Sequence, residues 1–252
     1  SFPNHHPDPS KLENMEDLIK SVKENKCSVG LAFDGDADRL GVISPKGEMI
    51  FPDRQMIMFS RQVIQSSPNA KIVFDVKCSK LLSDEIKKLK GKPLICKTGH
   101  TFIKQKIRET DALLGGEMSG HIFFNDRWPG FDDGIYAGAR MLEIIANSEQ
   151  DDPFITVPNM LSTPEINIPA ADEEKFQIVK TFIENSNFSD AKIVSIDGIR
   201  VEFEKGWGLL RPSNTSPCLV LRFEAETNED LKKIKEIFYL GLKSIKPNIN
   251  KF

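Results

Sequence analysis

The sequence predicts an α/β fold followed by a smaller α+β unit. Strands and helices are expected to alternate between about Met49 and Asn147, which is typical of a sheet with helices packed on it. A charged stretch at 149–153 ends in proline, and beyond it the pattern changes. Apolar and polar residues then alternate at 199–203 and 219–223, which indicates antiparallel strands with one buried face.

Each element of the first part follows from the spacing of its apolar residues and from its turn residues. Ser79 is expected to cap its helix, and acidic residues at 132–133 suit a helix N-terminus. In order, we expect a helix over 11–25, strands over 29–33 and 41–43 with a turn at 45–47, a helix over 54–65, a strand over 71–76, a helix from Ser79 to Leu89, a strand over 93–97, a helix from Thr101, a strand over 121–124 and a helix over 132–147.

The second part is expected to begin with a short strand at 165–168 and a helix opening at Asp172. Phe176, Val179, Phe182 and Ile183 would form the buried face of that helix. The two alternating strands follow, and a last helix over 229–244 ends the pattern.

Composition excludes several classes of protein. The chain has 252 residues, 39% of them apolar and 28% charged, as in ordinary soluble proteins. A net charge of −3 gives no reason to expect nucleic-acid binding, and no apolar run is long enough to span a membrane. The four cysteines are scattered and form no Cys-x-x-Cys pair, which indicates a reducing, cytoplasmic location.

Residues 34–39 read Asp-Gly-Asp-Ala-Asp-Arg and follow the apolar run 29–33. Three carboxylates this close repel one another unless a cation lies between them. All-oxygen ligands suit a hard ion, so we expect Asp34, Asp36 and Asp38 to bind Mg²⁺. The small residues between them let the loop curl around one centre.

Other interpretations of this loop differ in strength. An EF-hand loop is excluded, because its Gly and Glu positions hold Arg39 and Pro45. A solvated acidic turn is disfavoured by the apolar strand in front. A phosphatase with an aspartate nucleophile also places Asp-x-Asp after a strand, and that alternative stays open.

Residues 116–121 place a carboxylate, a hydroxyl and an imidazole at alternate positions: Glu117, Ser119 and His121. On an extended chain these side chains share one face. Glu and Ser can bridge neighbouring sugar hydroxyls, and His exchanges protons near neutral pH. A polar edge strand is the alternative.

The segment 211–217 is expected to lie between two strands and offers Arg211, Ser213, Asn214 and Thr215. A guanidinium with hydroxyls and turn amides is suited to a phosphate dianion, although an ordinary hairpin turn stays open. The segment 97–100 could bind an anion or cap a helix. Together the motifs predict a phosphosugar site with a bound metal, residues that bind sugar hydroxyls and residues that bind a second phosphate.

Five segments, in this order, resemble the α-D-phosphohexomutase family, most closely its bacterial phosphomannomutase/phosphoglucomutase group. They extend through the chain as 34–39, 75–78, 97–100, 116–121 and 211–215. Related glucosamine mutases tend to have Gln where Met118 stands, so the resemblance favours glucose and mannose phosphates.

The resemblance implies a four-domain enzyme in which a phosphoserine passes its phosphoryl group to a hexose monophosphate. The glucose or mannose 1,6-bisphosphate formed then turns round and returns its other phosphate. The implied roles are Mg²⁺ binding by Asp34, Asp36 and Asp38, charge neutralisation by Arg39, sugar contacts by Glu117 and Ser119, positions near the sugar for Lys77, His100 and His121, acid/base work by His121, and phosphate binding by Arg211, Ser213, Asn214 and Thr215.

The chain departs from the family in one respect. It contains no Thr-Ala-Ser-His-Asn-Pro-like loop around a nucleophilic serine. We therefore expect a C-terminal fragment without the phosphoserine domain, inactive alone: 1–44 as the tail of an α/β domain 2, 45–152 as a complete mixed-sheet domain 3, and 153–252 as a small antiparallel α+β domain 4. An exposed edge in 1–43 would leave this segment mobile or paired with another chain. A non-catalytic phosphosugar-binding fragment is a further alternative.

Overall fold

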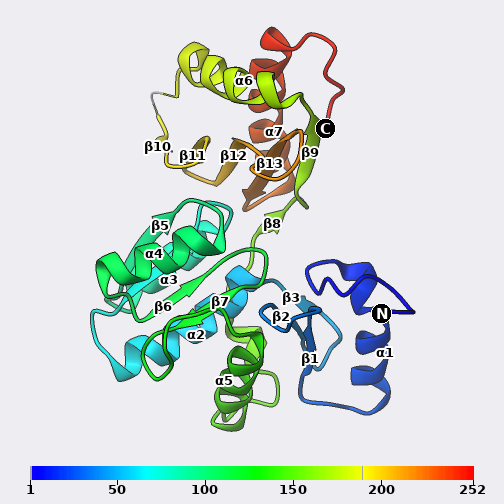
Figure 1. Cartoon of the computed structure of the whole chain (residues 1–252), viewed down its shortest axis with the longest axis vertical. Coiled ribbons are helices and arrows are strands. Elements are labelled where there is room, and N and C mark those ends of the chain that lie inside the picture. Colours follow the sequence, from blue (N-terminus) through cyan, green and yellow to red (C-terminus); the bar gives the residue numbers. More distant parts are fainter. Residues whose placement is uncertain (1, 189) are drawn as a thin grey trace. The chain divides into compact units, whose positions relative to one another are not determined.

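The computed structural model describes residues 2–188 and 190–252. The chain folds as two compact units, Ser1–Pro158 and Asn159–Phe252, and each is described here by itself (Figure 1). None of the described helices combines the length and the apolar character needed to cross a membrane.

The first unit opens with a small antiparallel sheet in the order β1-β2-β3. Its elements are the 3₁₀ helix η1 (Leu12–Met15), α1 (Glu16–Glu24), β1 (Gly30–Phe33), β2 (Leu40–Ile43) and β3 (Met49–Ile50). Met15 and Val22 pack with Ile43 in a small core, so the helix covers one face of this sheet. The Asp-rich loop is the connection between β1 and β2.

A mixed four-stranded sheet forms the larger part of this unit, in the order β5-β4-β6-β7. The strand β4 is parallel to both β5 and β6, whereas β6 and β7 are antiparallel. The elements are α2 (Pro52–Ser66), β4 (Lys71–Asp75), α3 (Lys80–Lys88), β5 (Lys92–Cys96), α4 (His100–Thr110), β6 (Leu114–Gly116), β7 (Ile122–Phe124), α5 (Gly134–Ala146) and the 3₁₀ helix η2 (Pro153–Thr156).

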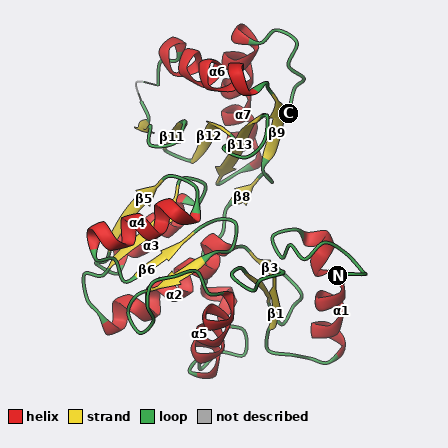
Figure 2. Ribbon diagram, viewed as in Figure 1, coloured by secondary structure: helices red, strands yellow, loops and turns green. Residues whose placement is uncertain are grey.

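Helices cover both faces of this sheet, as the alternating side chains of β4 require (Figure 2). Ile72 and Phe74 point into the core that contains residues of α2, α3 and α5. Val73 points to the other side and packs with Ile103 of α4. Because β4, β5 and β6 run parallel, the loops after these three strands meet at one edge of the sheet.

The second unit is an antiparallel sheet in the order β10-β11-β12-β13-β8, with β9 also paired to β13. Its elements are β8 (Leu161–Ser162), β9 (Ile166–Pro169), α6 (Asp172–Asn185), β10 (Lys192–Val194), β11 (Ile199–Phe203), β12 (Gly206–Pro212), β13 (Cys218–Ala225) and α7 (Asn228–Ile245). Phe182 of α6, Phe223 of β13 and Phe238 of α7 belong to its core.

The predicted fold class is confirmed: a mixed α/β unit precedes an antiparallel α+β unit. The division at 44/45 and 152/153 stays a prediction, as does pairing of 1–43 with another chain. The expected buried face of α6 is partly wrong. Val179 and Phe182 are buried, but Phe176 and Ile183 are 57% and 37% exposed. Ile178 is inside instead, because the helix turns its 178–182 stripe toward the sheet.

Candidate functional site

The Asp-rich loop curls so that its carboxylates gather. Oxygens of Asp34, Asp36 and Asp38 all lie within 4.8 Å of one another. The amide of Ala37 donates to the Asp34 carbonyl across 3.3 Å, and Ala37 has a φ of 61°, which is uncommon for a residue with a side chain. This all-oxygen donor set fits a hard divalent cation such as Mg²⁺.

Arg39 supplies a counter-charge to this loop. Its Nε donates to Oδ2 of Asp34 across 2.6 Å, and its backbone amide donates to Oδ1 across 3.1 Å. Burial works against ionisation, but these bonds and the guanidinium charge hold the pKa of Asp34 below its ordinary value. Burial, together with the charges of Asp34 and Asp36, raises the pKa of Asp38 although His121 opposes the shift. A bound cation would relieve that repulsion.

The turn between β6 and β7 carries the expected sugar-binding residues, but not on an extended chain as predicted. The amide of Gly120 donates to the Glu117 carbonyl across 3.1 Å, and the Glu117 amide donates to the His121 carbonyl across 3.0 Å. Gly120 has a φ of 105°, so the chain reverses here. The antiparallel pairing of β6 with β7 demands that reversal, and the prediction of one extended face is wrong.

The side chains of this turn nevertheless converge. The Nδ1 atom of His121 lies 2.8 Å from the Ser119 hydroxyl and 3.4 Å from Oε2 of Glu117. Burial lowers the pKa of His121, but the hydrogen bond and charge of Glu117 outweigh it, so the net shift is upward; Asp38 and Asp132 add to the rise. This imidazole can therefore hold a proton near neutral pH.

The Asp-rich loop is docked on this turn through the backbone. Arg39 and His121 form an antiparallel bridge, and the Leu40 amide donates to the Gly120 carbonyl across 3.1 Å. The amide of Gly134 in α5 donates to the Ala37 carbonyl across 3.0 Å. The metal-binding candidates and His121 are thus held together in one unit.

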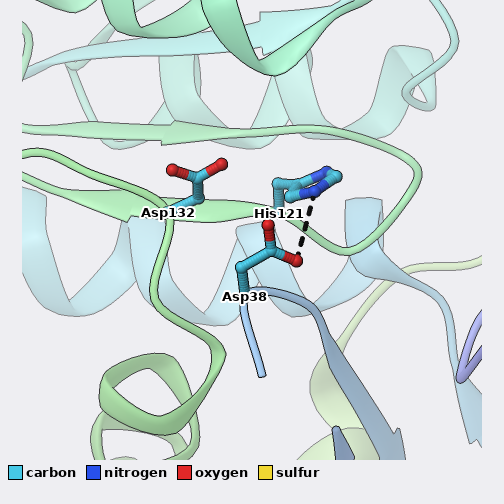
Figure 3. Close-up of side chains that lie close together, drawn as sticks. All are labelled: Asp38, His121 and Asp132. Atoms are coloured by element: carbon cyan, nitrogen blue, oxygen red, sulfur yellow. Dashed lines mark ion pairs between the residues drawn. The ribbon is translucent and has the colours of Figure 1, made fainter. Parts of the chain in front are cut away.

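A third group of side chains completes this centre. The Nε2 atom of His121 lies 3.4 Å from Oδ1 of Asp38, with the Asp132 carboxylate nearby (Figure 3). Asp132 lies 3.0 Å from Nδ1 of His100 and 3.0 Å from Nζ of Lys104. The imidazoles of His100 and His121 stack with centroids 5.6 Å apart.

Sequence reasoning missed Asp132 as a site residue, because two adjacent aspartates before a helix suit capping. Only one of them caps: Oδ1 of Asp133 accepts the Tyr136 amide across 2.8 Å. Asp132 is left to orient His100. The pair of adjacent aspartates could have indicated this role, since a helix needs one N-cap residue and the other aspartate is then available for the site.

Asp75 was also given no role from the sequence, yet it is fully buried at the end of β4. Its Oδ1 accepts the Lys77 amide across 3.1 Å and the Cys78 thiol across 3.3 Å, and its Oδ2 accepts the Met118 amide across 3.4 Å. Burial raises the pKa of Asp75 to about 6; the charge of Lys77 opposes this rise, whereas that of Glu117 adds to it.

Glu117 links a further loop to this centre. Its Oε1 accepts the Gly99 amide, at the start of α4, across 2.5 Å. Together with Asp75 it connects the loops that follow β4, β5 and β6. Lys77, in the loop after β4, and His100, at the start of α4, are therefore both close in the chain to residues bonded to the Glu117–His121 turn.

The remaining predicted residues belong to the second unit. Arg211 lies within β12 rather than in the turn after it, and it is buried. Its Nε donates to Oδ2 of Asp197 across 2.9 Å, whereas its Nη2 is a buried donor with no hydrogen-bond partner among the described residues. An unpartnered guanidinium nitrogen fits an anionic ligand.

The turn after β12 is organised by Ser213, which is buried. Its hydroxyl accepts the amides of Thr215 and Ser216 across 3.4 and 3.1 Å. Asn214 and Thr215 are exposed. The turn thus presents polar groups next to the Arg211 strand end.

Three models of one family match successive parts of this chain. The descriptions are phosphoglucomutase/phosphomannomutase, alpha/beta/alpha domain II at residues 1–47, alpha/beta/alpha domain III at 51–154, and C-terminal domain at 165–240.

Similar proteins and structures carry related names. A phosphomannomutase/phosphoglucomutase of Pseudomonas syringae is 51% identical over 252 residues, which are 99% of this chain and 54% of that protein. A phosphoglucomutase of Neisseria gonorrhoeae is 49% identical over 97% of this chain and 54% of its own length. The crystal structure of a phosphoglucomutase/phosphomannomutase family protein from Burkholderia thailandensis superimposes with a TM-score of 0.94 at 46% identity, covering 100% of this chain and 54% of the other.

The chain spans about half the length of the curated relatives that it matches. Successive domain matches, sequence identity and fold all agree on the same group of proteins. The chain belongs to the phosphoglucomutase/phosphomannomutase family.

Proposed function

We propose that this chain carries the metal-, sugar- and phosphate-binding parts of a phosphohexomutase. The reaction interconverts hexose 1-phosphate and hexose 6-phosphate through a bisphosphorylated sugar, with glucose and mannose as the sugars that Met118 favours. The docking of the Asp-rich loop on the Glu117–His121 turn carries the proposal, because the carboxylates expected to bind the metal lie beside an imidazole that can exchange a proton. The names of the relatives support this reaction class.

The first unit would act on the phosphoryl group in transfer. Asp34, Asp36 and Asp38 would hold Mg²⁺, which would supply positive charge against the phosphate oxygens. Arg39 would neutralise further charge from its position on Asp34. The phosphoserine would come from outside this chain, since no serine here lies in the family's loop.

The turn residues would orient the sugar and move its proton. Glu117 and Ser119 would contact hydroxyls that occupy similar places in both orientations of the sugar. These residues also hold Nδ1 of His121, which leaves Nε2 facing the Asp-rich loop. The neutral form of His121 would take the proton of the attacking hydroxyl, and the imidazolium so formed would return it in the reverse step. Lys77 and His100 would lie near the sugar.

The second unit would bind the phosphate that is not being transferred. Arg211 offers guanidinium nitrogens, Ser213 organises the turn, and Asn214 and Thr215 add exposed polar groups. A cytoplasmic location is part of this proposal, in keeping with the four free cysteines.

An aspartate-nucleophile phosphatase is the competing enzyme. Its nucleophile would be Asp34, but both oxygens of this carboxylate are held by Arg39, which disfavours attack on phosphorus. Such an enzyme would release inorganic phosphate from hexose phosphates without any other domain.

Calorimetric titration with glucose 1,6-bisphosphate, with and without Mg²⁺, tests the proposal. We expect saturable binding that weakens at least about tenfold in Arg211→Ala, since a charge-assisted hydrogen bond is lost. Arg108→Ala, which changes an exposed arginine on α4, is the control. Equal affinity in wild type and Arg211→Ala would contradict the phosphate assignment.

Activity measurements separate the alternatives. We expect no conversion of glucose 1-phosphate to glucose 6-phosphate by this chain alone with Mg²⁺ and the bisphosphate. Clear turnover would overturn the external phosphoserine, and steady release of inorganic phosphate would favour the phosphatase. Binding without turnover after addition of a serine-bearing domain would favour a non-catalytic phosphosugar-binding module.

A further inference from the structure

Asp197 accepts a hydrogen bond from the Nε atom of Arg211, so the nitrogens of this side chain left for a phosphate are the two Nη atoms at its tip. The Nε atom of Arg211 lies 2.9 Å from Oδ2 of Asp197. We propose that Asp197 is a positioning residue that orients the Arg211 guanidinium for phosphate. This inference rests on the proposed function, because it assumes that Arg211 binds a phosphate.

The geometry suits orientation because guanidinium is planar and rigid. A hydrogen bond at Nε helps to fix the plane of the group, and with it the directions in which the Nη N–H groups point. The contact is well enclosed: the side chains of Arg211 and Asp197 are only 5% and 10% exposed. The Nη2 atom remains without a hydrogen-bond partner among the described residues, so the guanidinium is oriented by Asp197 and can still donate hydrogen bonds to a ligand.

The backbone next to Asp197 is shaped for this close approach. Gly198 has a φ of 72°, and a Cβ there would lie 2.2 Å from the Leu210 carbonyl oxygen and 2.6 Å from Cα of Arg211. The pairing of Ile199 with Leu210 brings the loop to this place. Glycine is therefore needed directly after Asp197 to let the carboxylate reach Arg211.

Stability alone explains the pair poorly. A buried ion pair gains little over apolar residues of similar size, since both charges lose their hydration. The negative charge of Asp197 also weakens the attraction of Arg211 for an anion. An effect of Asp197 through charge would therefore oppose phosphate binding, whereas an effect through orientation would favour it.

These two effects separate cleanly in two variants. Asp197→Asn keeps an oxygen that accepts from Nε but removes the charge, so affinity for glucose 1,6-bisphosphate should stay within about threefold of wild type or improve. Asp197→Ala removes the acceptor and should weaken binding about tenfold. The loss should disappear in an Arg211→Lys background, because lysine has no Nε to be held.

Calorimetry on the 252-residue chain measures these affinities, and the thermal unfolding midpoint of each variant checks its fold. Wild-type affinity in Asp197→Ala, with weakened binding in Arg211→Ala, would overturn the positioning role alone. Wild-type affinity in both variants would instead overturn the phosphate assignment of Arg211. An equal loss in Asp197→Ala with and without Arg211→Lys would show that Asp197 does not act through Arg211.

A measurement on the wild type covers the case in which Asp197→Ala does not fold. The ¹⁵N-edited NMR signal of the Arg211 Nε–H group should exchange slowly with water and shift little on adding the bisphosphate. The Nη signals should shift strongly. A fast-exchanging Nε–H signal, or one that moves as much as the Nη signals, would overturn the inference.

Discussion

The Nε2 atom of His121 lies 3.4 Å from Oδ1 of Asp38, although the two residues belong to connections of different sheets. The backbone makes this contact: Arg39 and His121 form a bridge, and Leu40 donates to the carbonyl of Gly120. Because backbone bonds set the distance, changes of backbone packing should disturb this centre more than changes of side-chain charge.

Gly134→Ala tests this dependence. A Cβ at Gly134 would lie 2.7 Å from the Arg39 carbonyl oxygen and 2.9 Å from that of Ala37, and neither backbone atom can move freely. We expect a loss of about 1–3 kcal/mol in the free energy of unfolding, with weakened Mg²⁺ binding. Urea unfolding and calorimetry measure the two quantities.

Gly138→Ala is the matched control on the same helix. The three atoms nearest to its Cβ would be side-chain carbons of Phe33 and Leu31, at 3.2–3.4 Å, and side chains adjust more easily than backbone. Alanine favours helix by up to about 1 kcal/mol, so this variant should be neutral or stabilised. Equal behaviour of the two variants would contradict a special role for the contact at Gly134.

Asp36→Asn should weaken Mg²⁺ binding at least about tenfold without lowering stability, since the side chain is exposed and is one of the three candidate metal ligands. Titration calorimetry measures the Mg²⁺ affinity, and a thermal melt measures the stability. Asp17→Asn changes an exposed carboxylate on α1 and should leave both quantities unchanged. Unaltered Mg²⁺ affinity in Asp36→Asn would place the ion elsewhere.

Asp75 should make stability depend on pH. Burial raises its pKa from 3.8 to about 6 against the charge of Lys77, with Glu117 adding to the rise. The native state therefore binds this proton more tightly than the unfolded chain does. The stabilisation is complete below about pH 4 and is lost as the pH rises through about 6, by up to about 3 kcal/mol.

Asp75→Asn carries no such proton. Relative to wild type, the variant should therefore gain stability as the pH rises from about 4 to 7.5. Urea unfolding at several pH values gives the difference, in which the contributions of other carboxylates cancel. A difference that does not change with pH would show that Asp75 ionises normally.

Arg140→Met should destabilise the first unit by about 3–5 kcal/mol, because the largely enclosed carboxylate of Asp126 loses its two short hydrogen bonds and keeps the more distant Nε of Arg127, at 3.8 Å. Arg140 donates to both oxygens of Asp126 across 2.9 and 3.0 Å and to Gln62 across 2.9 and 2.6 Å. Arg127→Met breaks an exposed ion pair with Glu143 and a 3.8 Å contact with Asp126, and it should cost less than about 1 kcal/mol. Equal losses in chemical unfolding would contradict this difference.

The regular elements were largely predictable because each helix or strand depends mainly on residues that are close together in the sequence. Ser79 caps α3 as expected, and the strand 71–76 is β4 with residues 71–75. The short strands β3, β6, β8 and β10 carried too little periodic pattern to be predicted. The seven-residue strand β12 was missed as well, because it is buried along its whole length and shows no alternation of apolar and polar residues. The extended form expected for Glu117–His121 failed because the chain must reverse to pair β6 with β7.

The sequence by itself determined the fold class, the metal-ligand candidates and the phosphate-binding candidates, since these depend on local spacing and residue chemistry. The contacts that hold them were decided only by tertiary structure. Asp132 reaches His100, Asp75 reaches Met118, and Asp197 reaches Arg211, each across a stretch of chain that no periodic pattern spans. Parallel strands and paired hairpins bring such residues together, and local sequence does not record which partner each will meet.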